Sequence, residues 1–91
     1  MTSKNLFELK DKVVVLVGAS GLLGQQYSES LSEAGANVVL ADLNFLNCRK
    51  LESKLKKSYN VNPMSVKVDI TKKQSIIQMV KKVMKKYSKI D

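Results

Sequence analysis

Apolar residues gather in three short runs along the chain, and each run is followed by a longer segment in which they are spaced more widely. The runs are Val13–Val17, Asn37–Asp42 and Met64–Asp69. The first two are continuous and aliphatic, as in parallel strands that are buried on both faces. In the third, every second residue is apolar, which places these residues on one face of a strand. The pattern predicts three buried strands.

The segments between these strands show the three- and four-residue spacing of amphipathic helices. A first helix is predicted from Leu22 to Ala34, followed by Gly35 as a suitable stop, and a second from Asn47 to Tyr59. The expected apolar stripes comprise Leu23, Tyr27, Leu31 and Ala34 in the first helix and Cys48, Leu51, Leu55 and Tyr59 in the second. Each helix is expected to bury its stripe against the sheet.

A third helix is expected after the third strand. Residues Thr71–Gln74 fit a capping box, in which the Thr71 hydroxyl and the Gln74 amide satisfy free backbone donors at a helix start. The expected apolar stripe consists of Ile76, Ile77, Val80, Val83, Met84 and Tyr87. The opposite side of the helix carries Lys81, Lys82, Lys85, Lys86 and Lys89.

The alternation of strands and helices predicts an α/β fold, a Rossmann-like half domain with a three-stranded parallel sheet and helices on both faces. Right-handed crossovers give the strand order 3-2-1, with the first two helices on one face and the third on the other. We expect residues 1–91 to be the amino-terminal part of a larger domain, since Ile90 and Asp91 stand where a fourth strand would begin. Val13–Val17 would then be an exposed edge strand, and we expect self-association through it.

Length and composition limit the function classes. The chain of 91 residues is enough for one small domain, and 44% hydrophobic with 26% charged residues is an ordinary globular composition. One cysteine and no His leave no internal disulfide and no zinc site. The longest apolar run is too short to span a membrane, and residues 1–5 lack the apolar run of a signal peptide. We therefore expect a cytoplasmic protein with no membrane partner.

The net charge of +8 is concentrated in the second half of the chain. Residues 1–47 contain three basic and five acidic residues, whereas residues 48–91 contain thirteen basic and three acidic ones. Such asymmetry can indicate a nucleic-acid partner. However, aromatic residues make up only 5%, Trp is absent and no nucleic-acid-binding motif is present. A solvated lysine-rich face is therefore favoured over a nucleic-acid partner.

A glycine-rich turn, Gly18-Ala19-Ser20-Gly21-Leu22-Leu23-Gly24, joins the first strand to the first helix. Gly18 permits a tight turn, Gly21 allows backbone to approach a pyrophosphate, and Gly24 removes a side chain where the helix packs. Backbone N–H groups at the helix start, at the positive end of its dipole, would face the phosphates. Because the turn lies inside a βαβ unit, the pattern favours dinucleotide binding.

Two acidic residues end strands at the same edge of the predicted sheet. Asp42 ends the second strand 18 residues after Gly24, close to the spacing at which a carboxylate accepts hydrogen bonds from an adenosine ribose. It would repel a 2′-phosphate, and no basic residue follows before Arg49, so NAD is favoured over NADP. Asp69 ends the third strand, where open α/β sheets bind ligands. Its position alone is equally consistent with a helix-entry role.

Residues 9–24, 33–42 and 68–71 together resemble the start of a short-chain dehydrogenase/reductase. The resemblance implies that Asp69 contacts the adenine amino group and that Ile70 flanks the ring. It also implies that Ser20 lines the pyrophosphate turn and that Leu23 contributes backbone. The predicted cofactor-binding residues are therefore Gly18, Ser20, Gly21, Leu23, Gly24, Asp42, Asp69 and Ile70. The resemblance implies that the full-length protein transfers hydride between a nicotinamide cofactor and an alcohol or carbonyl substrate, with a sugar derivative as one candidate.

The chain departs from the family pattern in two respects. Val17 stands where the classical subfamily has Thr, and the middle glycine is residue 21 rather than 22, a spacing like that of the extended subfamily. In the family, the Asn-Asn-Ala-Gly segment, the catalytic Ser and the Tyr-x-x-x-Lys pair lie beyond residue 91. The three tyrosines here are followed four positions later by Leu31, Pro63 and Asp91. We therefore predict no catalytic residue in this chain and no hydride transfer by it alone.

Two other functions fit part of the pattern. A stand-alone nucleotide-binding module would use its basic third helix to meet RNA or another acidic partner. A methyltransferase also combines a glycine turn with an acidic residue at the end of the second strand, with S-adenosylmethionine as its ligand. The oxidoreductase interpretation accounts for more of the residues than either of these.

Overall fold

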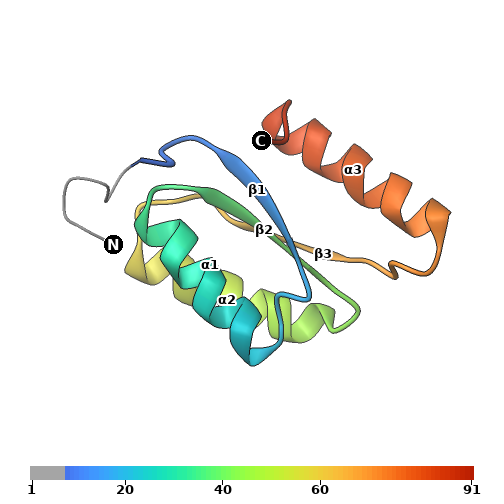
Figure 1. Ribbon diagram of the computed structural model, residues 1–91, viewed down its shortest axis with the longest axis horizontal. Helices are drawn as coiled ribbons and strands as arrows, with labels where there is room; N and C mark the ends of the chain where they lie inside the picture. The colour runs from blue at the N-terminus through green and yellow to red at the C-terminus, as the bar shows by residue number, and fades with distance from the viewer. Residues whose placement is uncertain (1–7) are drawn as a thin grey trace.

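The computed structural model describes residues 8–91, in which three parallel strands alternate with three helices (Figure 1). The elements are β1 (Val13–Val17), α1 (Leu22–Glu33), β2 (Asn37–Asp42), α2 (Phe45–Ser58), β3 (Met64–Lys67) and α3 (Lys73–Tyr87). The central strand β2 pairs in parallel with both neighbours, with Val39 opposite Val15 and Ala41 opposite Val66. The predicted fold class and strand order are confirmed. Residues 1–5, on which the signal-peptide argument rests, lie outside the described residues.

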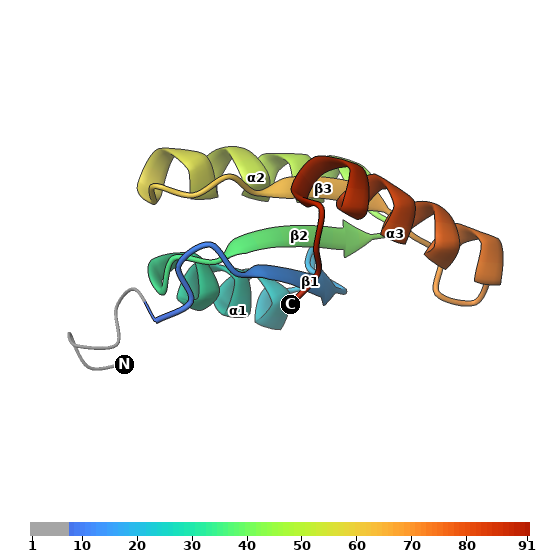
Figure 2. The ribbon, with the colours of Figure 1, turned by 90° about the horizontal axis from the view of Figure 1, so that it is seen from above.

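Apolar layers cover both faces of the sheet. The helices α1 and α2 lie on one face and α3 lies on the other, as predicted (Figures 1 and 2). The layer beneath α1 and α2 contains Ala19, Ala36, Val38, Leu40, Cys48, Leu51 and Leu55. The layer beneath α3 contains Val13, Val39, Ala41, Val66, Val68, Met79 and Val83. Successive residues of β2 thus face opposite layers, which explains why this strand is apolar throughout.

The buried face of α1 differs from the predicted stripe. Leu23 and Tyr27 are 61% and 56% exposed, whereas Gly24, Ser28 and Ser32 are buried. The buried positions recur every four residues, and their small size lets the helix backbone lie close to the sheet. The Ser28 hydroxyl is satisfied because it donates to a carbonyl of the preceding turn (2.8 Å). The prediction holds for Leu31 and Ala34, which pack on the core, and is wrong for Leu23 and Tyr27. Hydropathy does not register a helix face made of small residues.

The helix α2 begins two residues before its predicted start. The Asn44 side chain caps it by accepting a hydrogen bond from the Asn47 N–H (3.1 Å), so the helix already includes Phe45. The predicted stripe of this helix is confirmed, and its Cys48 is completely buried. Burial raises the pKa of the Cys48 thiol to about 11. The neutral thiol therefore packs as a small apolar core group.

The capping box predicted for the third helix is wrong. Lys72 is the N-cap residue of α3, and no side chain caps the helix there. The Thr71 hydroxyl donates to the Asp69 carboxylate instead (2.6 Å), and the Asp69 N–H donates to the Ser75 hydroxyl (2.8 Å). A charged acceptor two residues away competes with the helix start for the Thr71 hydroxyl, and hydrogen bonds to charged groups are the stronger ones.

The apolar stripe of α3 is buried along one side only. Val83 and Met79, of which the predicted stripe includes only Val83, are buried against the sheet, and Tyr87 packs beside them. Ile76, Val80 and Met84, which belong to the predicted stripe together with Val83 and Tyr87, are 37%, 38% and 42% exposed. The stripe is thus wider than the contact that α3 makes with the sheet.

β1 is the edge strand that the sequence predicts, but the last residue of the chain lies beside its first (Figure 2). The Asp91 N–H donates to the Val13 carbonyl and the Val13 N–H donates to the Asp91 carboxylate, both at 2.8 Å. Strand residues alternate in direction, so the backbone groups of Val15 and Val17 point to the same open side as those of Val13. In residues 8–91 the sheet has no further strand on this side.

Gly24 lies where the first turn of α1 crosses the glycine turn. A Cβ at residue 24 would lie 2.5 Å from the Gly18 carbonyl oxygen and 2.7 Å from the Ala19 Cα. Both are backbone atoms, so no flexible side chain is available to move aside. A Cβ at Gly21 would meet only the Gly18 oxygen at 3.6 Å, which is an ordinary contact. The fold therefore requires glycine at residue 24 but not at residue 21.

Gly24→Ala is expected to destabilise the fold by about 1–3 kcal/mol or more, because overpacking against backbone outweighs the roughly 1 kcal/mol that alanine gains within a helix. Gly21→Ala is the matched control, with an expected change below about 1 kcal/mol. Urea unfolding followed by circular dichroism measures both. Equal stability of the two variants would contradict the close contact at Gly24.

Candidate functional site

The glycine turn leads from β1 into α1 and lies against the end of β2. Gly18 has a φ of +81°, in the left-handed region that glycine adopts without strain. Its N–H donates to the Ala41 carbonyl (2.8 Å), which ties the turn to β2 one residue before Asp42. The turn and Asp42 are thereby brought together.

The start of α1 is open to an anion. Gly21 is the N-cap residue, no side chain caps the helix, and its first turn contains no acidic residue. The N–H groups of residues 22–24 precede the first intrahelical bond, which Gln25 donates to the Gly21 carbonyl (2.9 Å). Such donors at the positive end of a helix dipole are a common setting for a phosphate. The Leu23 side chain is exposed, which agrees with the backbone role that the family resemblance implies.

The Asp42 carboxylate bridges the end of β2 and the glycine turn. Its Oδ2 accepts hydrogen bonds from the Ser20 N–H (3.1 Å) and the Ser20 hydroxyl (2.7 Å), and its Oδ1 accepts one from the Asn44 N–H (3.0 Å). The bonds from Asn44 and Ser20, in that order, hold the pKa of Asp42 below its usual value, although burial acts in the opposite direction. The carboxylate is therefore ionised at neutral pH and oriented by both segments.

Asp69 has the helix-entry role that its position allows. Its Oδ1 accepts hydrogen bonds from the Thr71 N–H (3.0 Å) and hydroxyl (2.6 Å), and its Oδ2 lies 4.0 Å from the Lys72 ammonium. Hydrogen bonding by Thr71 lowers the pKa of Asp69. A second ionised carboxylate is thus held at the edge where Asp42 lies.

These groups meet at a cavity of about 180 Å³ at the carboxyl ends of the strands. Its lining comprises Val17, Gly18, Asp42, Leu43, Val68, Asp69, Ile70 and Thr71. Four of the eight predicted cofactor-binding residues therefore line one cavity. Ser20 is joined to it through Asp42, and the remaining three belong to the turn and helix start that follow Gly18.

Leu43 is a lining residue that the sequence analysis missed. It is 59% exposed and directly follows Asp42, just as Ile70, which is 62% exposed, directly follows Asp69. β2 ends at Asp42, and β3 ends at Lys67, two residues before Asp69 and earlier than predicted. In both places an aspartate is followed by an exposed aliphatic residue, and this repetition is visible in the sequence. Two large apolar side chains at the rim favour a ligand with a flat apolar face.

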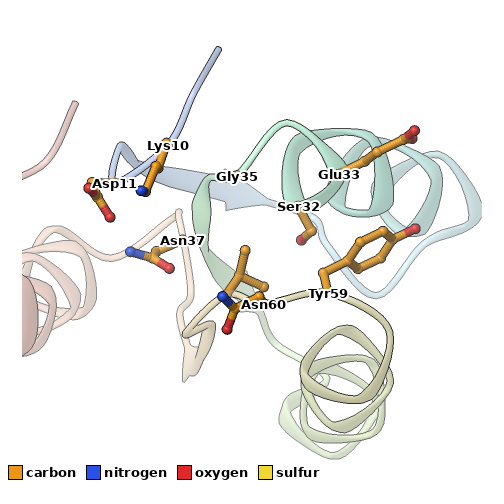
Figure 3. A pocket seen from close by; sticks show the side chains of 9 residues that line it. Lys10, Asp11, Ser32, Glu33, Gly35, Asn37, Tyr59 and Asn60 are labelled. Carbon is orange, nitrogen blue, oxygen red and sulfur yellow. The ribbon is translucent and has the colours of Figure 1, made fainter. Parts of the chain in front are cut away.

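A larger cavity, of about 540 Å³, lies at the opposite edge of the sheet (Figure 3). It is lined by Lys10, Asp11, Ser32, Glu33, Gly35, Asn37, Tyr59, Asn60 and Val61, none of which is a predicted site residue. α1 ends at Glu33 and α2 at Ser58, so the negative ends of two helix dipoles lie at this edge. A pyrophosphate is disfavoured there despite the larger volume.

Two properties of α3 bear on its partners. The Lys86 ammonium donates to the Pro63 carbonyl (3.2 Å), and the Lys89 ammonium forms an ion pair with Asp91 (2.9 Å). Two of the five lysines of the predicted basic side are thus engaged within the molecule. Neither α3 nor any other helix in residues 8–91 has the length and apolar character needed to cross a membrane.

Comparison with known proteins places this geometry in a family. The family model for short chain dehydrogenase matches residues 12–91. An NAD-dependent glycerol dehydrogenase from Listeria innocua is 38% identical over 88 residues, which cover 93% of this chain and 32% of that protein. The chain therefore spans about a third of the length of this relative.

Solved structures show the same fold. A xylitol dehydrogenase with bound NAD⁺ is 28% identical and superposes with a TM-score of 0.86, covering 92% of this chain and 32% of that one. An NADPH-dependent 3-quinuclidinone reductase from Rhodotorula rubra is 28% identical with a TM-score of 0.87, covering 96% and 33%. Both NAD and NADP thus occur among the similar proteins.

The family match accounts for the glycine turn, for Asp42 and for the parallel sheet together. The family match gives no support to the RNA-binding alternative. It also accounts for the glycine turn, so the methyltransferase alternative is not needed to explain it. Fold, site and matched residues agree: the chain belongs to the short-chain dehydrogenase family.

Proposed function

We propose that this chain binds NAD at the carboxyl edge of its sheet. The pyrophosphate would lie at the start of α1, the adenosine ribose at Asp42, and the adenine between Leu43 and Ile70 beside Asp69. The observation that carries this proposal is the convergence of the uncapped helix start, two ionised carboxylates and an apolar-rimmed cavity at one edge. The absence of a side chain at Gly21, which internal packing does not require, supports it further.

The preference for NAD over NADP rests on Asp42. Its carboxylate is ionised and held in place by donors from Ser20 and Asn44, so a 2′-phosphate would meet a fixed negative charge. The glycerol dehydrogenase relative is NAD-dependent, which agrees with this assignment. A similar structure is an NADPH-dependent reductase, so we propose that local side chains such as Asp42, and not the fold, set the preference.

In a complete domain, the cofactor would exchange hydride with an alcohol or carbonyl substrate, including sugar derivatives and polyols. The relatives named for glycerol and xylitol support this substrate class. We propose that residues 1–91 are the amino-terminal part of such a domain, acting in the cytoplasm, and that they hold the cofactor without catalysing. The chain's own contribution is binding and orientation, because its tyrosines lack the paired lysine.

Asp42→Ala is expected to weaken NAD binding by about tenfold or more and to bring the NADP affinity closer to that for NAD, because hydrogen bonds to a charged group contribute about 1.5–3 kcal/mol. Isothermal titration of both dinucleotides into both proteins measures this. Asp11→Ala, at the opposite edge of the sheet, is the matched control and should leave both affinities unchanged. Unchanged affinities in Asp42→Ala would remove this residue from the site.

Copies of the chain are proposed to associate through the open edge of β1. The Val13 carbonyl at this edge already accepts a hydrogen bond from the Asp91 N–H, and the backbone groups of Val15 and Val17 point to the same side, which supports the proposal. An edge of this kind is a template for further pairing.

Sedimentation velocity is expected to show oligomers that weaken in Val17→Lys, because a lysine on an edge strand opposes pairing. Val17 is 49% exposed, so the substitution does not disturb the core. Leu46→Lys is the control, because it also replaces an exposed apolar side chain by lysine, but on α2, where Leu46 is 73% exposed. It should leave the oligomers unchanged. A wild-type protein that sediments as a monomer at all concentrations and unfolds cooperatively would overturn this proposal.

A further inference from the structure

One wall of the larger cavity is fixed by backbone contacts (Figure 3). This wall is the turn of residues 9–12, whose first N–H donates to the Ala34 carbonyl just after α1 (2.9 Å). Gly35 has a φ of +97°, and a Cβ there would lie 2.9 Å from the Lys10 Cα, so the turn packs directly on the glycine backbone. Lys10 and Asp11 are therefore held beside the end of α1.

The facing wall is the loop that follows α2, where Asn60 and Val61 line the cavity. The Asn62 N–H donates to the Asn37 side-chain carbonyl (2.8 Å), so the loop is bonded to the first residue of β2. The Tyr87 hydroxyl donates to the Asn62 carbonyl (2.6 Å), which adds a bond from α3. Both walls are thus held in place by the fold. The cavity volume of about 540 Å³ lies within the usual range of ligand pockets.

The cavity presents hydrogen-bond donors and acceptors together. None of the ion pairs within residues 8–91 includes Lys10 or Asp11, so an unpaired cation and an unpaired anion adjoin at its rim. Asn37 uses its carbonyl oxygen within the fold and keeps its two amide N–H donors. The Ser32 hydroxyl is buried and has no hydrogen-bond partner within residues 8–91, an arrangement that folded proteins normally avoid. The Glu33 carboxylate points away from the cavity (Figure 3).

This combination disfavours a simple ion of either sign. A cation would meet Lys10, and an anion would meet Asp11 and the negative ends of the α1 and α2 dipoles. A hydroxyl group both donates and accepts, so neighbouring hydroxyl groups of a neutral ligand can donate to Asp11 while they accept from Lys10 and Asn37. The half-buried Tyr59 ring offers an apolar surface to the C–H groups of a sugar ring.

We propose that this cavity binds a neutral monosaccharide, with its hydroxyl groups bonded to Asp11, Lys10 and Asn37 and its ring against Tyr59. Asn60, exposed at the rim, supplies a further donor and acceptor. A sugar ring is favoured over an open-chain polyol because a rigid ligand loses less conformational freedom on binding. The site lies at the opposite edge of the sheet from the proposed NAD site and does not depend on it.

Titration of D-glucose, D-mannose and D-xylose into the ¹⁵N-labelled chain, followed by amide NMR spectra, tests the proposal. At least one of these sugars is expected to shift the amides of residues 32–37 and 59–61 saturably. The expected Kd is on the order of 1 mM, as for a small ligand held by a few polar contacts. Ethylammonium chloride and sodium phosphate at the same concentrations should leave these amides unchanged, because each ion meets a like charge.

Two variants assign the contacts. Asp11→Gly removes the carboxylate, and glycine adopts the φ of +65° found at this residue without strain. It is expected to weaken sugar binding by about tenfold or more, because a hydrogen bond to a charged group is lost. Asn60→Ala should weaken it about 3–10-fold. Asn47→Ala, at an exposed position of α2 outside this cavity, is the matched control and should bind as the wild type does.

Three results would overturn the proposal. They are the absence of shifts at these amides with all three sugars, equal shifts with either ion, and a wild-type Kd in both Asp11→Gly and Asn60→Ala. NAD added to the same labelled protein reports separately through residues 18–24. Failure of the sugar site would therefore leave the proposed NAD site standing, and failure of the NAD site would leave the sugar site standing.

Discussion

The contact between residue 24 and the Gly18 carbonyl is the constraint on which the rest of the site depends. No side chain fits between the first turn of α1 and the backbone of the glycine turn, so the helix begins directly on the turn. The glycine turn is also bonded to the end of β2, because the Gly18 N–H donates to the Ala41 carbonyl. These two contacts place Ser20 against Asp42, residues that are far apart in the chain.

The helix directions give the two edges of the sheet opposite electrostatic character. α1 and α2 both begin at the carboxyl edge, where Asp42 and Asp69 are held ionised by nearby donors, and both end at the opposite edge. Helix starts favour anions, while the two carboxylates favour hydroxyl and amino donors. An adenosine diphosphate group contains both kinds of partner. The larger cavity offers volume without a helix start, which is why volume alone does not identify the site.

Periodicity was sufficient to locate the strands, because it reflects which residues must avoid water, and the right-handed crossover rule gave the strand order and the helix sides. Periodicity failed for the first part of α1, where the buried face consists of Gly24, Ser28 and Ser32 and is defined by close approach rather than by hydropathy. It also failed at Thr71, because the competing acceptor Asp69 becomes apparent only when the loop geometry is known.

The site was predictable in part. The glycine turn and Asp42 have fixed positions within a βαβ unit, so sequence spacing was enough to predict that they lie at one edge. The bond between Ser20 and Asp42 was not, since it joins residues 22 positions apart and depends on the register of β1 against β2. That Leu43 lines the cavity also depends on this register and was not predicted, although its likeness to Ile70 was visible in the sequence.

Titration of NAD into ¹⁵N-labelled protein, followed by amide NMR spectra, tests the central claim most directly. The account predicts that the amide shifts change at residues 18–24, at 42–44 and at 69–71, and that Asn37 and Asn60 in the larger cavity stay unchanged. Shift changes centred on the larger cavity, or none at the glycine turn, would contradict it.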